Sequence, residues 1–294
     1  MDINYLKTHI KTALKEDIGS GDCSSICCID EQKTNKAKLI AKQNGIICGV
    51  DVVRMVFEEV DKYIDFVALK TDGEIIKTGD TIFKVSGKSR SILAAERTAL
   101  NYIQRLSGIA TQTAEYVELI KGTNAKLLDT RKTTPTLRLL EKYAVKTGGG
   151  SNHRVGLYDM IMLKDNHIDF AGGISNAINR AYEFVTNDYE SQIKHINSAK
   201  TAQKIKIEVE VRNFNELNEV LNTGKIDRIM LDNFSVSDLK QAISLINGRY
   251  ETEASGGITK ETIRNFAEIG VDFISVGALT HHINSLDLSL IADK

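Results

Sequence analysis

Hydrophobic and polar residues follow two different patterns along this chain, and the first of them is irregular. Apolar residues recur at helical spacing over residues 6–17, 51–60 and 91–122, which predicts three helices. Residues 36–50 and 72–87 instead carry short β-rich runs around glycines, as expected for strands joined by turns. We interpret residues 72–87 as a structural β-sandwich element, because they lack the displayed lysine hairpin of a lipoyl or biotinyl carrier.

The second pattern begins at Lys126, where short apolar strands start to alternate with helical stretches. Its predicted strands end at Asp129, Lys164, Glu210, Asp232, Ser255 and Gly277. The last four of these ends are 22, 23 and 22 residues apart, which suits repeated βα units. A β/α barrel builds its active site at such strand ends, so polar or small residues after nearly every strand favour a barrel. A doubly wound sheet is the alternative, and it would concentrate them at one switch point.

The segment before the IKIEVE strand is longer than one helix requires. Residues 171–185 have helical spacing and predict one helix. Residues 189–204 predict a helical extension on the outside of the domain, to which we assign no chemistry.

The composition is that of a soluble globular protein, because 42% of the 294 residues are hydrophobic and 26% are charged. The formal net charge of -1 argues against a nucleic-acid binder that relies on a global basic field. No apolar run approaches the ~20 residues of a transmembrane helix. The first residues predict an amphipathic helix rather than a signal peptide. We therefore expect a cytoplasmic protein that binds neither membranes nor nucleic acid.

The four cysteines are Cys23, Cys27, Cys28 and Cys48. They contain no C-x-x-C pair, and no histidine lies near them in the sequence. Free, partly buried thiols are therefore favoured over a metal site.

Basic residues gather near the predicted strand ends of the second part. Five of them fall within 34 residues, namely Arg131, Lys132, His153, Arg154 and Lys164. Arginine can grip a carboxylate or phosphate with two hydrogen bonds, whereas lysine acts as a compact point charge. The cluster predicts a substrate with several negative charges. A run of ordinary surface charge is the alternative.

Two acidic residues, Glu210 and Asp232, end consecutive predicted strands. In a barrel they would be neighbours at the mouth, where two carboxylates repel unless Mg²⁺ or a sugar diol lies between them. The alternative is that they are helix-capping or loop acids.

Small residues end the last two predicted strands, in the segments EASGGIT and SVGALT. Backbone N–H groups beside a helix start can hold a phosphate, and barrels frequently bind phosphate after their seventh and eighth strands. With the cations and the acids, these turns predict a pocket for a sugar phosphate and a polycarboxylate.

The segment DTRKTTPTLRLLEKYAVKTGGGSNHRVGLYDMIMLKDNH closely resembles the central motif of quinolinate phosphoribosyltransferases, also called nicotinate-nucleotide pyrophosphorylases (carboxylating). The segments EDIGSGDCSS, ERTALNYIQRLSGIAT, IEVEV, LDNF, EASGGIT and ISVGALT follow the family's order, so the resemblance covers nearly the whole chain. The departures are the extra stretch before IKIEVEV and Thr136, where the family often has glycine.

The resemblance implies an α/β fold with an N-terminal α/β sandwich domain over residues 1–112. An incomplete, open β/α barrel would follow over residues 113–280, and a tail at 281–294 would pack back on the first domain. The implied enzyme is a pentosyltransferase of NAD biosynthesis. It would join quinolinate to phosphoribosyl pyrophosphate and give nicotinate mononucleotide, pyrophosphate and CO₂. Mg²⁺ and a homodimer, or a dimer-based hexamer with shared active sites, are implied as well.

The resemblance also implies a role for each candidate residue. The quinolinate carboxylates would be surrounded by Arg131, His153, Arg154 and Lys164. Lys132 would reach toward the pyrophosphate-bearing sugar, Thr133 would join the substrate-binding set, and Arg97 would enter from the partner subunit. Glu210 and Asp232 would face the ribose and Mg²⁺. The 5-phosphate would be held by Ser255, Gly256, Gly257 and Gly277. The implied catalytic residues are Lys132, Lys164, Glu210 and Asp232.

Three other interpretations remain open on the sequence. A related molybdenum-operon protein of the same fold shares much of the central motif. A Schiff-base aldolase would use Lys164 as its nucleophile. A non-catalytic sugar-phosphate binder would have no use for a grip on a dicarboxylate.

Overall fold

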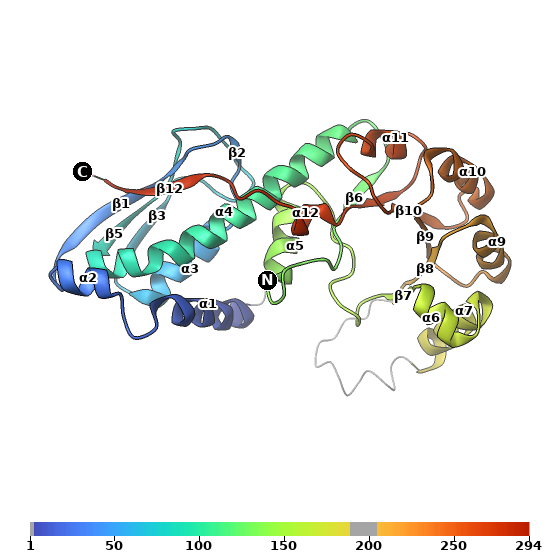
Figure 1. Cartoon of the computed structure of the whole chain (residues 1–294), viewed down its shortest axis with the longest axis horizontal. Coiled ribbons are helices and arrows are strands. Elements are labelled where there is room, and N and C mark those ends of the chain that lie inside the picture. Colours follow the sequence, from blue (N-terminus) through green and yellow to red (C-terminus); the bar gives the residue numbers. More distant parts are fainter. Residues whose placement is uncertain (1–2, 189–204, 294) are drawn as a thin grey trace. The chain divides into compact units, whose positions relative to one another are not determined.

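The computed structural model describes residues 3–188 and 205–293, so the predicted helical extension at 189–204 lies outside the described residues. The described chain forms two compact units (Figure 1). The sandwich unit comprises residues 1–115, 132–150 and 278–294, and the barrel unit comprises residues 116–131 and 151–277. These units interleave along the chain, whereas the predicted domains are contiguous. Among the described residues, no helix is both long and apolar enough to cross a membrane.

The sandwich unit is built on a four-stranded antiparallel sheet with the order β12-β1-β5-β3. Its strands are β1 (Thr34–Ala41), β3 (Asp65–Ala68), β5 (Thr81–Lys88) and β12 (Leu288–Ala292). A small second sheet pairs β2 (Gly45–Ile46) with β4 (Ile75–Ile76). The last strand of the chain thus lies beside the first, with Ala37 opposite Ala292.

Helices pack around this sheet. They are α1 (Ile3–Ile18), α2 (Cys23–Cys28), α3 (Val50–Val60), α4 (Ser89–Leu119), α5 (Arg138–Thr147) and α12 (Ala278–His281). The three helices predicted in this part of the chain are confirmed as α1, α3 and α4. Leu6, Ile10 and Leu14 form the buried stripe of α1 at helical spacing. Rings of Phe57 and Phe83 pack edge to face in the core, 5.9 Å apart between centroids.

The barrel unit is a sheet of six parallel strands with the order β6-β11-β10-β9-β8-β7. The strands are β6 (Lys126–Leu128), β7 (Ile161–Leu163), β8 (Ile207–Val211), β9 (Arg228–Asp232), β10 (Glu251–Ser255) and β11 (Phe273–Ser275). Neighbours follow chain order from β7 to β11, so the sheet winds in one direction and has no switch point. This confirms the predicted barrel over a doubly wound sheet, and the sheet ends at β6 and β7, so the barrel is open.

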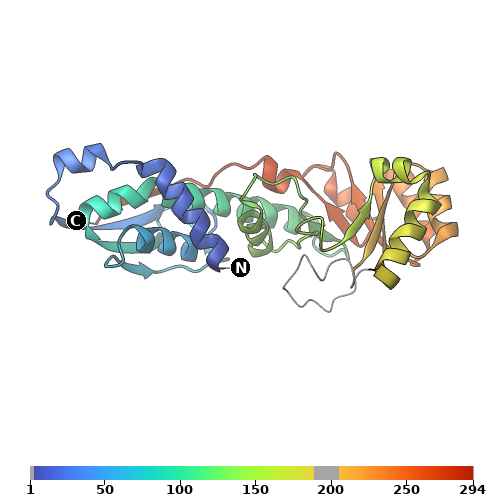
Figure 2. The same cartoon turned by 90° about the horizontal axis from the view of Figure 1, so that it is seen from below.

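Helices connect the strands of the barrel unit on its outer side (Figure 2). They are α6 (Asp165–Ala171), α7 (Ile174–Glu183), η1 (Phe184–Asp188), α9 (Phe214–Thr223), α10 (Val236–Ile246) and α11 (Ile263–Ala267). The helix predicted over 171–185 is confirmed as α7, which begins later than predicted, at Ile174. Gly172 and Gly173, with φ of 82° and 116°, end α6 in a backbone conformation that a right-handed helix cannot continue.

Candidate active site

Side chains of one face of the barrel sheet are mostly polar, although the strands themselves are buried. Because side chains alternate along a strand, Glu208 and Glu210 of β8 share a face. The strand register places Glu208 beside Arg228 of β9, and Arg228 beside Glu251 of β10. This polar face has a mouth at the carboxyl ends of the strands, formed by Glu210, Asp232 and Ser255. It also has a floor two residues deeper, at Glu208 and Glu253.

Lys164 and Glu210 form an ion pair at the mouth. Lys164 follows β7 and is the N-cap residue of α6, where its backbone N–H donates to His167 Nδ1 at 3.1 Å. The side chain of Lys164 is 40% exposed and that of Glu210 is 10% exposed. The structure therefore brings two of the predicted catalytic residues together, with the ammonium on the solvent side.

Asp232 is oriented by the residue that follows it. Asn233 has a left-handed backbone with φ of 57°, and its side-chain amide donates to Asp232 Oδ2 at 2.7 Å. Its backbone N–H donates to the carbonyl of Ser255 at 2.8 Å, which ties the ends of β9 and β10 together. These contacts explain why LDNF and EASGG occur at neighbouring strand ends.

Gly256 is required by this packing. A Cβ there would lie 2.2 Å from Asn233 Oδ1, and the residue has φ of 97°. Gly257 also has a positive φ of 61°, but a Cβ there would meet nothing within 4 Å. At the next strand, the N–H of Val276 donates to the carbonyl of Leu128 at 3.0 Å, just before Gly277. Gly257 thus leaves open space beside the end of β10.

The helix-capping alternative for the two acids is wrong for these helices. The N-cap of α9 is Asn213, whose side chain accepts from the N–H of Glu216. The N-cap of α10 is Ser235, which accepts from the N–H of Asp238. Glu210 and Asp232 are therefore not used to cap the helices that follow their strands.

Two arginines line one wall of the mouth. Burial and then the charge of Arg131 lower the pKa of Arg154, so the two guanidinium groups are close enough to repel. Arg154 Nη1 donates to the carbonyl of Met160 at 3.2 Å. Within residues 3–188 and 205–293, no carboxylate pairs with the exposed Arg131. A bound anion would relieve the repulsion between these two cations.

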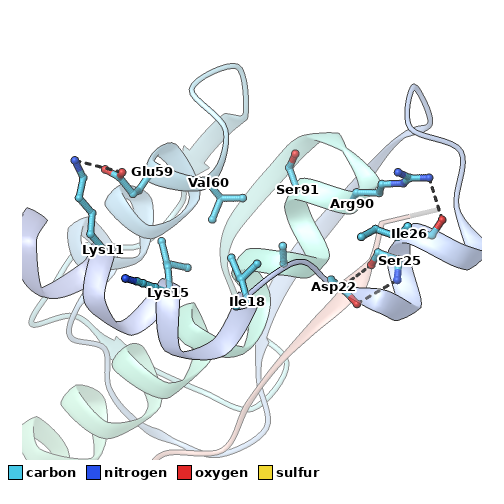
Figure 3. A pocket seen from close by; sticks show the side chains of 13 residues that line it. Lys11, Lys15, Ile18, Asp22, Ser25, Ile26, Glu59, Val60, Arg90 and Ser91 are labelled. Carbon is cyan, nitrogen blue, oxygen red and sulfur yellow. Dashed lines mark hydrogen bonds and ion pairs between the residues drawn. The ribbon is translucent and has the colours of Figure 1, made fainter.

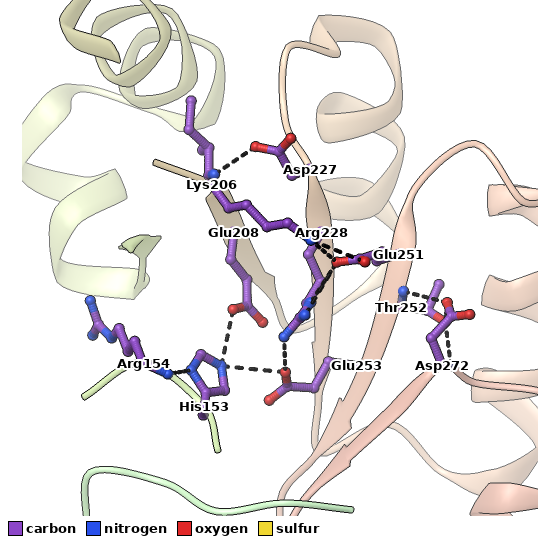
Figure 4. A network of polar contacts seen from close by, with 11 residues as sticks. His153, Arg154, Lys206, Glu208, Asp227, Arg228, Glu251, Thr252, Glu253 and Asp272 are labelled. Atoms are coloured by element: carbon purple, nitrogen blue, oxygen red, sulfur yellow. Dashed lines mark hydrogen bonds and ion pairs between the residues drawn. The ribbon is translucent and has the colours of Figure 1, made fainter. Parts of the chain in front are cut away.

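His153 lies on the floor, between three strands of the polar face (Figure 4). Its Nε2 lies 3.1 Å from Glu208 Oε2 and 3.3 Å from Glu253 Oε2, and all three side chains are at most 5% exposed. On the opposite side of the ring, Nδ1 accepts the backbone N–H of Arg154 at 2.6 Å. The backbone N–H of His153 donates to Asp129 Oδ1 at 2.8 Å.

Arg228 neutralises one of the two buried glutamates. Its Nη1 lies 3.0 Å from Glu253 Oε2, and its other nitrogens reach Glu251 Oε2 at 3.2 and 3.3 Å. Lys206 continues the network outward, 2.9 Å from the same Glu251 oxygen. Burial raises the pKa of Glu253, but contacts with His153, Ser275 and Arg228 outweigh it and leave that pKa below its ordinary value.

Two of the floor residues, His153 and Glu208, have pKa values above their ordinary ones. Burial, followed by the negative charge of Glu253, raises the pKa of Glu208. Burial lowers the pKa of His153, but hydrogen bonds and charge from the two glutamates outweigh it and raise that pKa to about 9. His153, Glu208 and Glu253 also offer ligand atoms within 4.8 Å of one another, as no other group of the described residues does. Within this group the Arg228 guanidinium already contacts Glu253.

Three predicted site residues, Arg97, Lys132 and Thr133, belong to the sandwich unit. Arg97 is exposed on α4. The carbonyl of Lys132 accepts from Thr280 Oγ1 at 2.8 Å, and Thr133 Oγ1 accepts from Arg138 Nε at 3.1 Å. Their proximity to the other predicted residues stays a prediction.

The sandwich unit has a hollow of about 490 Å³ that none of the predicted site residues lines (Figure 3). The polar groups that line this hollow form hydrogen bonds and ion pairs with nearby residues of the same unit. Lys11 Nζ lies 3.6 Å from Glu59 Oε1, and Asp22 accepts from two N–H groups as the N-cap of α2. Arg90 donates to two backbone carbonyls beside that helix. We assign this hollow no chemistry.

Sequence reasoning missed Glu208, Arg228 and Glu253. Their signal was the strict alternation in IEVEV and the acids at the first and third positions of ETEAS. Strands of a parallel barrel are normally apolar on both faces, so charged residues inside two such strands mark a polar interior. The free cysteines, in contrast, are confirmed, with Cys48 buried and the other three exposed.

Comparison with known proteins covers almost the whole chain. Residues 22–107 match the N-terminal domain of quinolinate phosphoribosyl transferase, and residues 109–291 match its C-terminal domain. A chloroplastic nicotinate-nucleotide pyrophosphorylase [carboxylating] of Arabidopsis thaliana is 43% identical over 98% of this chain and 83% of its own length. A probable nicotinate-nucleotide pyrophosphorylase [carboxylating] of Bacillus subtilis is 40% identical over 97% of this chain and 92% of its own length.

Two solved structures share the fold. The nicotinate-nucleotide pyrophosphorylase of Francisella tularensis superimposes with a TM-score of 0.89 at 41% identity, over 100% of this chain and 98% of that chain. The protein of the same name from Ehrlichia chaffeensis gives 0.89 at 33% identity, with both chains covered completely. The predicted fold class is confirmed by these superpositions and by the open parallel sheet.

Proposed function

Since the chain belongs to the quinolinate phosphoribosyltransferase family, we propose that it joins quinolinate to phosphoribosyl pyrophosphate and releases pyrophosphate and CO₂. The product is nicotinate mononucleotide, a precursor of NAD. One observation of the structure supports this proposal independently of the family. The mouth combines two mutually repelling arginines, Arg131 and Arg154, with the ion pair of Lys164 and Glu210.

The cationic wall suits quinolinate, whose two adjacent carboxylates supply the missing negative charge. Arg131 and Arg154 would each hold a carboxylate through a charge-assisted contact. Lys164 would add a third positive charge beside the ring. Nicotinate lacks the 2-carboxylate and would leave part of this wall unpaired, at a cost of roughly 1.5–3 kcal/mol for each lost contact.

The acidic residues Glu210 and Asp232 suit the charge that develops on the ribose. When the bond from the ribose carbon to pyrophosphate breaks, pyrophosphate takes the electron pair and positive charge develops on the ribose. Carboxylates of Glu210 and Asp232 would stabilise that charge. The pyridine nitrogen then bonds to the ribose carbon and becomes a pyridinium. The electron pair left by departing CO₂ is stabilised by that positive charge until the ring carbon takes a proton from water.

Mg²⁺ fits this donor set. Glu210 and Asp232 offer carboxylate oxygens from adjacent strands, and Mg²⁺ is commonly held by one or two carboxylates together with substrate phosphates. The ion would neutralise the leaving pyrophosphate. Ser255, Gly256, Gly257 and Gly277 would hold the 5-phosphate, which the open space beside Gly257 supports.

We further propose a homodimer, or a dimer-based hexamer, in which Arg97 completes the partner's site. The exposure of Arg97 on α4 supports this, since its neighbours Gln104 and Arg105 are engaged within their own unit. Mixing inactive Arg97→Ala and Lys164→Ala variants should restore roughly a quarter of the activity, because half of the dimers then hold one intact site. Proven subunit exchange without recovery would contradict a shared site.

A reducing compartment such as the cytoplasm is supported by the unbonded thiols of Cys27 and Cys28, whose sulfur atoms lie 3.2 Å apart on the surface. Cell fractionation of the native organism would test this location. Detection only in an oxidising compartment would contradict it.

The decisive assay follows nicotinate mononucleotide formation from quinolinate, phosphoribosyl pyrophosphate and Mg²⁺. Product is expected with quinolinate and not with nicotinate. Comparable turnover of both acids would contradict the proposal. Borohydride trapping of a carbonyl substrate on Lys164 would instead indicate an aldolase, although an ammonium held by Glu210 is not a nucleophile.

A further inference from the structure

We propose that Arg105 is a positioning residue of this enzyme, which holds together two chain segments on which the binding of phosphoribosyl pyrophosphate depends. One segment comprises residues 132–134 and begins with Lys132, and the other is α12, which directly follows Gly277. The inference rests on the proposed function and on the role that the family resemblance implies for Lys132 at the pyrophosphate-bearing sugar. Neither of these assigns a role to Arg105.

A buried carboxylate fixes the guanidinium group of Arg105. Nε and Nη2 of Arg105 donate to Glu141 Oε1 at 2.9 and 2.7 Å. Glu141 lies on α5 and its side chain is 0% exposed, whereas the side chain of Arg105 on α4 is 30% exposed. Because a buried carboxylate is costly without its cation, the pair holds α4 and α5 in a fixed arrangement.

The same ion pair contacts both chain segments. Arg105 Nη2 also donates to Thr134 Oγ1 at 2.8 Å and to the backbone carbonyl of Thr280 at 3.2 Å. Glu141 adds a contact of its own, since its Oε2 accepts the N–H of Thr134 at 3.1 Å. Arg105 therefore connects the segment 132–134 to α12 within the sandwich unit.

Thr280 extends this connection to Lys132. Its Oγ1 donates to the backbone carbonyl of Lys132 at 2.8 Å, and the residue is 0% exposed. Burial, the charge of His282 and then the charge of Lys132 lower the pKa of His281, so the Lys132 ammonium lies near α12. Arg105 thus holds the carbonyl of the residue whose hydroxyl holds Lys132.

The start of α12 is held by the same helix. Gln112 lies seven residues after Arg105 on α4, and its Nε2 donates to the carbonyl of Ala278 at 2.8 Å. Residues seven apart share one face of a helix. One face of α4 therefore contacts both Thr280 and Ala278, the residue that directly follows Gly277.

This connection suits one substrate more than the other. Lys132 and Gly277 would hold the pyrophosphate end and the 5-phosphate end of the same molecule, so their spacing has to be fixed. A displacement of about 1 Å in such a group can lower a rate roughly 100-fold. Arg131 and Arg154, which would hold quinolinate, belong to the barrel unit. Loss of the connection should therefore affect phosphoribosyl pyrophosphate and spare quinolinate.

The test measures kcat and the Michaelis constant (KM) for each substrate in two variants of the complete chain. Thr280→Val keeps the shape of the side chain but loses the bond to Lys132. Arg105→Lys keeps a charge beside Glu141 but loses the planar fork that reaches Thr134 and Thr280. Each variant should raise KM for phosphoribosyl pyrophosphate about tenfold, with KM for quinolinate within about threefold of wild type.

Two matched controls come from the same unit and should keep wild-type constants. Thr113→Val removes a similar bond, because the buried Thr113 hydroxyl donates to the carbonyl of Ile109 at 2.7 Å inside α4. Arg90→Lys changes another arginine that donates to backbone carbonyls, at 2.8 and 3.1 Å from Ile29 and Ile26.

A double variant separates positioning from folding. Arg105→Met leaves Glu141 buried and unpaired, so it should lower the melting temperature. Arg105→Met combined with Glu141→Met removes both charges and should recover most of that temperature, because apolar side chains often replace a buried ion pair without loss. The raised KM for phosphoribosyl pyrophosphate should persist, since Thr134 and Thr280 stay unconnected.

Three results would overturn the inference. They are a wild-type KM for phosphoribosyl pyrophosphate in Thr280→Val or Arg105→Lys, equal rises of both KM values, and a double variant with wild-type constants. A wild-type enzyme that makes no nicotinate mononucleotide would instead overturn the proposed function. Calorimetry of phosphoribosyl pyrophosphate binding to the same variants tests the inference even then, and equal affinities in wild type and Thr280→Val would contradict it.

Discussion

Glu208 and Glu210 lie two residues apart on β8 and point to the same face, yet their surroundings differ completely. Glu210 meets the ammonium of Lys164 at the mouth. Glu208 is fully buried 3.1 Å from the ring of His153, and burial raises its pKa. The same residue type is thus paired with a partly exposed lysine in one layer and fully buried beside a histidine in the next. Burial and partner, rather than residue type, decide which role a carboxylate takes.

The largest effect is expected for the acids of the mouth. Asp232→Asn should lower turnover roughly 100-fold or more, because a preorganised charge facing the ribose is lost. Quinolinate binding, measured by calorimetry, should persist. Asp238→Asn, in the first turn of α10, serves as the control and should match wild type. Unchanged turnover in Asp232→Asn would remove the acid from the mechanism.

A second prediction concerns how the stability of the protein depends on pH through the floor residue His153. The folded pKa of His153, about 9, lies above its ordinary 6.5, so its contribution is fully present below pH 6.5 and is lost as the pH rises through 9. The raised pKa of Glu208 acts with the same sign. Denaturant unfolding followed by circular dichroism should show a free energy of unfolding lower by up to about 3 kcal/mol at alkaline pH. The loss should be smaller in Glu208→Gln, and a flat wild-type profile would contradict a proton-holding floor.

A third prediction tests whether the arginines Arg131 and Arg154 bind quinolinate. Arg131→Lys keeps the charge but loses the planar fork, so KM for quinolinate should rise about tenfold with a smaller change in kcat. Arg249→Lys is the matched control, since Arg249 only donates to carbonyls at the end of α10. Steady-state kinetics of both variants would decide. Identical constants would mean that Arg131 is an ordinary surface charge.

The smallest effect distinguishes the two glycines after β10. Gly256→Ala forces a Cβ against Asn233 in a left-handed conformation, and should cost about 1–3 kcal/mol of stability and weaken binding of phosphoribosyl pyrophosphate. Gly257→Ala meets no neighbour and should cost about 1 kcal/mol. Thermal unfolding with and without the substrate would measure both. Equal costs would show that the contact with Asn233 does not matter.

The mouth could be predicted from the sequence, because its residues lie at the ends of short, regularly spaced segments with strand-like patterns. Lys164, Glu210, Asp232 and Ser255 all lie within one residue of a strand end in the structure. The regular spacing of those ends also predicted the barrel. Such a prediction needs only the local pattern of apolar and polar residues, which is clear in this sequence.

The floor could not be predicted in the same way. Glu208 and Glu253 lie inside strands, and their meeting with His153 depends on strand register and on a loop remote in sequence. The division of the chain into two interleaved units could not be predicted from the sequence either. Residues 132–150 join the sandwich unit through contacts such as the 2.7 Å ion pair between Arg105 and Glu141, which no local pattern reveals.

The central claim is that Glu210 at the mouth takes part in the reaction that we propose, whereas Glu208 two residues below it does not, and one comparison tests it most directly. Glu208→Gln and Glu210→Gln make the same chemical change two residues apart. At pH 7, nicotinate mononucleotide formation should fall roughly 100-fold or more in Glu210→Gln. In Glu208→Gln, kcat should remain within about threefold of wild type, because Glu208 is fully buried below the mouth. Equal losses in the two variants would contradict the account.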